Sequence, residues 1–87
     1  MYLIIAYDVN VARVNKVKKF LRKYLHWVQN SVFEGEATQA TLEEIKIGLK
    51  EIIDEGEDMV VIYKFRSVEA FKKEIIGVEK GYCEEII

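Results

Sequence analysis

The chain has 87 residues, of which 51% are hydrophobic and 11% aromatic, and its formal net charge is −2. A chain of this length forms one core, so residues 1–87 are expected to be a single domain. No run of residues approaches the roughly 20 apolar positions that a membrane helix needs. The single cysteine, Cys83, excludes an internal disulfide and fits a reducing compartment. These features predict a cytoplasmic protein.

The first half of the chain predicts one strand, one helix and a second strand region. Residues 2–7 are a short apolar run that ends at Asp8, which is typical of a strand. Asn10 then caps a helix over about residues 11–25, because apolar residues recur there at helical spacing. Residues 26–36 return to strand chemistry and predict two short strands or one bulged strand. The apolar helical positions are Val14, Val17, Leu21 and Tyr24.

The second half predicts a helix followed by strands. Thr38 or Thr41 opens the helix, the latter with Glu44 in capping-box position, and Gly56 ends it. Residues 59–66 form another apolar strand, residues 68–75 suggest a short helical turn, and a last strand lies at about 82–87. The buried stripe of this second helix is expected to be Leu42, Ile45, Leu49, Ile52 and Ile53.

The order β-α-β-β-α-β with a trailing strand predicts an α+β fold, the ferredoxin-like sandwich. Two helices can cover only one face of its sheet. Residues 2–7 and 59–62 are nevertheless apolar on both faces, which is expected only where both faces are buried. A second copy is the simplest cover for the other face, so the sequence predicts a homodimer.

The charge is divided unevenly along the chain. Residues 1–33 carry one acid and six bases, and residues 34–87 carry the other fourteen acids and seven bases. The six bases lie on or beside the first predicted helix, where they either attract phosphates or simply solvate a helix face.

Asp8 is the acid of the basic half, and it directly follows an apolar strand. A carboxylate beside a buried strand needs a cation or hydrogen-bond donors. Mg²⁺ is often held by one or two carboxylates and several waters, so a second copy could complete a site that one Asp8 cannot. The alternative is that Asp8 caps the following turn. His26 is the only histidine, which excludes a histidine-cluster metal site within one chain, and no phosphate-cradling loop is present.

Two motifs resemble those of a known family. Tyr7-Asp8-Val9 at the end of the first strand is similar to its Y-D-[VI] signature. Residues 29–35, with the sequence QNSVFEG, are similar to its Q-x-S-V-F-x-G signature. The basic segment between them, which includes residues 13–17, resembles the family's helix-opening pattern. The chain therefore resembles the CRISPR-associated protein 2 family, the small partner of the adaptation integrase, over essentially its whole length.

The resemblance implies a ferredoxin-like homodimer whose last strand, at about 82–87, pairs with the partner's sheet. It implies an adaptation protein that binds duplex DNA with the integrase during spacer acquisition. It also implies a Mg²⁺-dependent endonuclease, acting on single-stranded RNA or duplex DNA, with Asp8 as metal ligand and Tyr7 and Phe33 at the catalytic site. The basic residues implied to meet phosphates are Arg13, Lys16, Lys19, Arg22 and Lys23.

The alternative within the same family is a structural DNA-binding scaffold that does no catalysis. Trp27 stands where some members carry an arginine two positions before the glutamine, so a phosphate role of that arginine has no counterpart here. A ferredoxin-like small-molecule regulatory domain is a third option, but no glycine-rich loop supports it.

Overall fold

The structure, a computed structural model, describes residues 1–81. Cys83 and the last strand predicted at about 82–87 lie outside the described residues. Neither helix in the described range combines the length and apolar character needed to cross a membrane.

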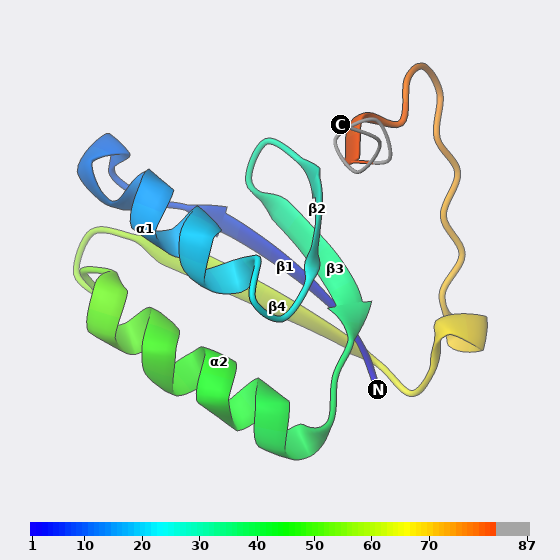
Figure 1. Ribbon diagram of the computed structural model, residues 1–87, viewed down its shortest axis with the longest axis horizontal. Coiled ribbons are helices and arrows are strands. Elements are labelled where there is room, and N and C mark those ends of the chain that lie inside the picture. Colours follow the sequence, from blue (N-terminus) through cyan, green and yellow to red (C-terminus); the bar gives the residue numbers. More distant parts are fainter. Residues whose placement is uncertain (82–87) are drawn as a thin grey trace.

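Four strands form one antiparallel sheet with the order β2-β3-β1-β4 (Figure 1). This arrangement confirms the predicted ferredoxin-like α+β fold. The turn between β2 and β3 has a positive φ of 34° at Asn30, and the pairing shifts between Trp27 and Gln29. Both predicted alternatives for this region are therefore partly right: there are two strands, and one bulge. The strands are β1 (Tyr2–Asp8), β2 (His26–Gln29), β3 (Val32–Glu36) and β4 (Met59–Phe65).

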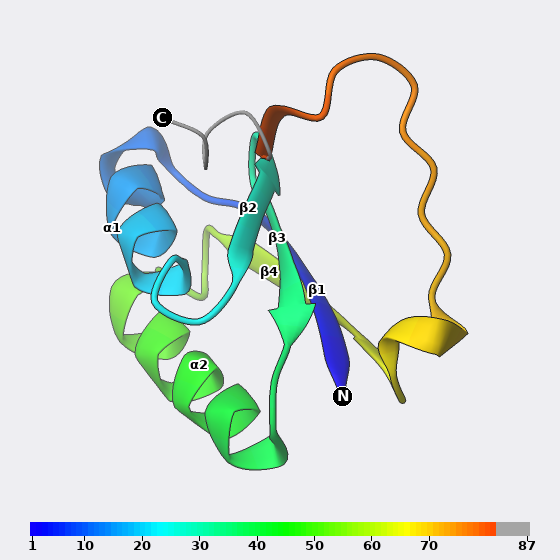
Figure 2. The ribbon, with the colours of Figure 1, turned by 45° about the vertical axis from the view of Figure 1, so that its right-hand side comes forward.

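Two capped helices pack on the same face of the sheet (Figure 2). They are α1 (Val11–Leu21) and α2 (Gln39–Ile52). The Asn10 side chain accepts the Ala12 N–H at 2.9 Å, and the Thr38 hydroxyl accepts the Thr41 N–H at 3.1 Å, so both predicted caps are present. Each satisfies a backbone donor that the first helical turn leaves without an intrahelical partner.

Both helices end earlier than predicted. The first stops at Leu21 instead of residue 25, because the chain turns there and brings Leu25 into the core, where it is 6% exposed. The second stops at Ile52, since Ile53 is already extended, and Gly56 lies in the following turn. Periodicity alone could not show either end, because the core accepts apolar side chains from a turn as readily as from a helix.

The core lies between the helices and the sheet. Side chains of β1 alternate, so that Leu3, Ile5 and Tyr7 point toward the helices and are buried. The helices approach closely where the Phe20 ring lies over Gly48, and a Cβ at Gly48 would collide with that ring. The other buried apolar residues are Val17, Leu21, Leu25, Phe33, Leu42, Ile45 and Leu49.

The opposite face, here called the open face, carries the alternate residues of β1 and β4. The strand register places Ile4 beside Tyr63 and Asp8 beside Met59. Met59 and Tyr63 are 59% and 53% exposed. The sheet therefore presents apolar side chains on the side that no helix covers.

The chain after β4 runs along the side of the sheet away from the helices (Figure 2). A single 3₁₀ turn, Val68–Ala70, replaces the longer helical turn expected over residues 68–75. Phe71 then stacks on Tyr2 with a centroid separation of 5.1 Å, and Lys73 Nζ donates to Glu34 Oε2 at 3.2 Å. These contacts hold the start of this segment against the open face.

Candidate nucleic-acid and metal site

Asp8 is exposed at the end of β1 and belongs to the open face. Its neighbour across the strand pair is Met59, and the residue before it on the same face is Ala6. Asp8 does not cap α1, because Asn10 does so. The capping role considered for Asp8 is thus taken by another residue, and its carboxylate stands at the edge of an apolar surface.

A single copy of the chain makes a poor metal site. No group of three or more potential ligands among His, Cys, Asp and Glu occurs in residues 1–81. Asp8 therefore offers one carboxylate. Mg²⁺ bound by protein typically uses one or two, together with waters or substrate phosphates, so a single copy supplies the minimum. The carboxylate oxygens of Asp8 are the kind of ligand that Mg²⁺ prefers, and a second copy would supply a second carboxylate.

The structure places Tyr7 and Phe33 away from Asp8, on the helix face of the sheet. Phe33 is fully buried and Tyr7 is 6% exposed, and their rings stack with centroids 6.3 Å apart. Both side chains therefore pack in the core of a single copy, and the catalytic role predicted for them stays a prediction. The reason for this placement is strand alternation, which turns neighbouring residues to opposite faces.

The Tyr7 hydroxyl lies in this buried environment as well. Burial raises the pKa of this phenol more than the nearby Ser31 and Arg22 side chains lower it. The hydroxyl has no hydrogen-bond partner among the residues that the structure describes. A buried neutral phenol of this kind packs as an aromatic ring.

The lysines on α1 and just after it form two groups. Lys18 lies over the Trp27 ring at 5.2 Å and Lys23 over the Phe20 ring at 5.9 Å, so their stems and charges pack on aromatic faces. Lys16 and Lys19 are exposed, and neither forms an ion pair within the described part of the chain. A shallow hollow along the helix is lined by Asn15, Lys16, Lys18, Lys19 and Arg22.

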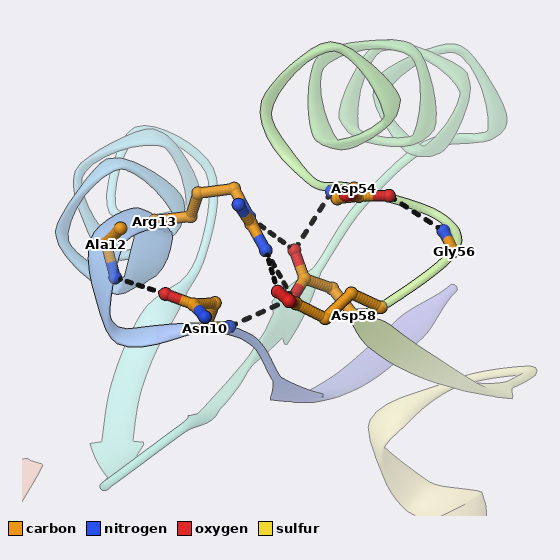
Figure 3. A network of polar contacts seen from close by, with 7 residues as sticks. Asn10, Ala12, Arg13, Asp54, Gly56 and Asp58 are labelled. Atoms are coloured by element: carbon orange, nitrogen blue, oxygen red, sulfur yellow. Dashed lines mark hydrogen bonds and ion pairs between the residues drawn. The ribbon is translucent and has the colours of Figure 1, made fainter.

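Arg13, the first base of α1, faces in another direction. Its guanidinium donates to Asp58 from Nε at 2.6 Å and from Nη2 at 3.0 Å, and Nη2 also reaches Glu57 at 2.6 Å (Figure 3). Two carboxylates therefore balance its charge, and these bonds raise its pKa further. The phosphate role predicted for Arg13 stays a prediction, but its cation is already engaged within the chain.

Sequence reasoning missed Asp58. Its side chain is fully buried and accepts two backbone N–H groups as well as Arg13. The hydrogen bonds from Arg13 hold the pKa of this carboxyl well below its usual range, against a smaller opposing effect of burial. A signal was present, because Asp58 directly precedes the apolar strand β4, just as Asp8 is the last residue of the apolar strand β1. Both carboxylates lie at the same end of the paired strands.

The family model described as CRISPR associated protein Cas2 matches residues 1–73. The chain belongs to the Cas2 family. A relative from Archaeoglobus fulgidus, named CRISPR-associated endoribonuclease Cas2 2, is 68% identical over all of this chain and 96% of its own length. A relative from Thermococcus kodakarensis, named CRISPR-associated endoribonuclease Cas2, is 63% identical over the whole of both chains.

Solved structures agree with this assignment. One described as the crystal structure of cas2 has a TM-score of 0.83 and 50% identity, covering 92% of this chain and 90% of that one. The Cas2 of Streptococcus pyogenes, described at pH 6.5, has a TM-score of 0.78 and 34% identity, covering 88% of this chain and all of that one. The resemblance drawn from the two sequence motifs is thus confirmed, and the chain is a CRISPR-associated protein.

Proposed function

We propose that the chain acts in the cytoplasm as a homodimeric CRISPR adaptation protein that binds nucleic acid beside the integrase. We propose further that it cleaves phosphodiesters with Mg²⁺ held by Asp8 from each copy. The observation that carries this proposal is the exposed carboxylate of Asp8 at the rim of a sheet face that bears exposed apolar side chains and that no helix covers. The names of the relatives, which specify an endoribonuclease, support the same activity.

The open face is the surface on which a second copy would sit. Its exposed apolar side chains include Met59 and Tyr63, and burying such area from water is the main favourable term in most associations. Two-fold pairing puts the same patch on both copies. A rim residue such as Asp8 would then meet its own counterpart wherever the rim lies near the two-fold axis.

The chemistry assigned to the chain's residues is limited. When bound, Mg²⁺ polarises a phosphoryl oxygen and lowers the pKa of a bound water. The two Asp8 carboxylates would hold it, and Lys16 and Lys19 would bind flanking phosphates of the nucleic acid. The paired carboxylates Glu57 and Asp58 serve Arg13 and are not available as a base.

The scaffold function is the second candidate. It is favoured by the lack of a group of three potential metal ligands in residues 1–81, because each copy then offers Mg²⁺ a single carboxylate, the fewest that such a site uses. In that case the same dimer would bind duplex DNA and support spacer insertion, and Asp8 would do no chemistry.

Asp8→Asn separates the two functions, since it keeps the side-chain shape and removes the charge that Mg²⁺ needs. Labelled single-stranded RNA and duplex DNA are incubated with parent and variant, with and without Mg²⁺, and duplex affinity is measured in parallel. Glu51→Gln, which removes one exposed acid from α2, is the matched control. A metal-dependent nuclease predicts at least a hundredfold loss of cleavage, about 2.7 kcal/mol, with little change in affinity. Equal cleavage by parent and Asp8→Asn would contradict the nuclease proposal.

A further inference from the structure

The Asp58 carboxylate is saturated by hydrogen bonds and fully buried. Oδ1 accepts the Asn10 N–H at 2.9 Å and Arg13 Nη2 at 3.0 Å. Oδ2 accepts Arg13 Nε at 2.6 Å and the Asp54 N–H at 2.9 Å (Figure 3). A carboxylate has about four lone-pair sites, so Asp58 uses its whole accepting capacity, and two of the four bonds come from a charged donor.

These bonds tie the segment that follows Asp8 to the start of the neighbouring strand β4. Asn10 lies two residues after Asp8, and its N–H is held by Asp58. Met59, which follows Asp58 directly, is the register partner of Asp8 on β4. The same carboxylate therefore fixes the backbone after Asp8 and the start of the strand beside it. Arg13 adds the first turn of α1 to this assembly.

We infer that Asp58 is a positioning residue for Asp8 and that Arg13 is its clamp instead of a phosphate contact. The inference rests on the proposed metal role of Asp8. A metal ligand must be held within about 0.5 Å of its productive position by groups that are themselves fixed, and supporting partners of this kind typically contribute 10–100-fold in metal affinity or activity. Asp8 ends a strand, so the turn that follows it governs where its side chain lies.

Asp58→Asn tests the inference, because the amide replaces one of the two accepting oxygens with an NH₂ group, which cannot accept the two hydrogen bonds made to that oxygen. Glu57→Gln is the matched control, since Glu57 is half-exposed, binds only Arg13 and leaves the four bonds of Asp58 intact. Leu42→Val, a fully buried change on α2, controls for a general loss of stability.

Two readouts are taken on the full-length folded proteins. The first is hydrogen exchange of the Asn10 and Asp54 amides against that of core amides such as Ile5. The second is the affinity for Mn²⁺, used as the probe of the Asp8 site, with Asp8→Asn as reference. Asp58→Asn is expected to speed exchange at least tenfold at whichever of the Asn10 and Asp54 amides faces the new NH₂ group, and to weaken Mn²⁺ binding at least tenfold. Glu57→Gln and Leu42→Val should change neither selectively.

The outcomes separate this inference from the proposed function. If Asp8→Asn loses Mn²⁺ while Asp58→Asn binds it as the parent does, the positioning inference is overturned and the proposed function stands. If Asp8→Asn binds Mn²⁺ as the parent does, the proposed function fails, and the metal role of Asp58 fails with it. Unchanged exchange at both Asn10 and Asp54 in Asp58→Asn overturns the inference by itself.

Should Asp58→Asn not fold, Arg13→Gln takes its place. It keeps both backbone hydrogen bonds of Asp58 and removes the guanidinium. The same two changes are then expected at a smaller size, without a parallel loss of duplex affinity. Parent-like exchange and Mn²⁺ affinity in Arg13→Gln, or a loss of duplex affinity alone, would refute the clamp role.

Discussion

Tyr63→Ser tests whether the open face is where two copies meet. Tyr63 lies near the middle of β4, opposite Ile4, and is 53% exposed. A tyrosine can bury about 150–250 Å², so roughly 100 Å² per copy remains to be covered. At about 25 cal/mol per Å² this area contributes about 2.5 kcal/mol per copy, or about 5 kcal/mol per dimer. Incomplete burial and the ordering of side chains reduce the realised value to about half.

The expected result is a dimer dissociation constant raised by roughly 100-fold, since every 1.4 kcal/mol is about tenfold. Sedimentation equilibrium over a dilution series of parent and variant measures it. Ile47→Ser, which removes a 62% exposed apolar side chain from α2, is the control and should leave the constant unchanged. A parent that sediments as a monomer at micromolar concentration, or equal weakening by both variants, would refute the reasoning.

Three further predictions concern the other parts of the site. Replacing Lys16 and Lys19 with Gln should weaken duplex binding. It should also lower the slope of log affinity against log salt concentration by roughly two units, about one per phosphate contact. If replacing two lysines of α2 with Gln gives the same slope, the phosphates are bound elsewhere. Tyr7→Phe should change the free energy of unfolding by less than about 1 kcal/mol and leave cleavage intact, whereas a tenfold loss of cleavage would show a catalytic role. The lowered pKa of Asp58 means that its stabilisation is complete above the ordinary carboxyl pKa of about 4 and is lost as pH falls toward the lower folded value. Urea unfolding from pH 5 downward should therefore show a shallower acid dependence for Asp58→Asn than for Glu57→Gln, and parallel curves would contradict this assignment.

The element order and the buried faces could be predicted from the sequence because they follow from local pattern. Apolar periodicity identified both helices, and side-chain oxygens at Asn10 and Thr38 identified their caps. The uncovered second face of the sheet also followed, since two helices cannot cover both sides. Helix ends were less accurate, because Leu25 is buried from a turn and carries the same apolar signal as a helical residue.

The candidate site could be predicted only in part. Tyr7 and Asp8 are neighbours in one sequence motif and were therefore assigned to the same site. Side chains alternate along a strand, however, so Tyr7 points into the core and Asp8 toward the open face. Arg13 looked like its basic neighbours, because nothing local reveals a partner 45 residues away. Asp58 was overlooked for the same reason, since its hydrogen bonds join segments that only the fold brings together.

If Asp8 from two copies shares one divalent ion, the number of ions bound per chain is fixed at one half. Mn²⁺ is titrated into the parent and into Asp8→Asn at a protein concentration where both are dimers, and free ion is followed by electron paramagnetic resonance. We expect one tightly bound ion per two chains in the parent and none in the variant. One ion per chain, or the same tight binding in both proteins, would contradict this sharing.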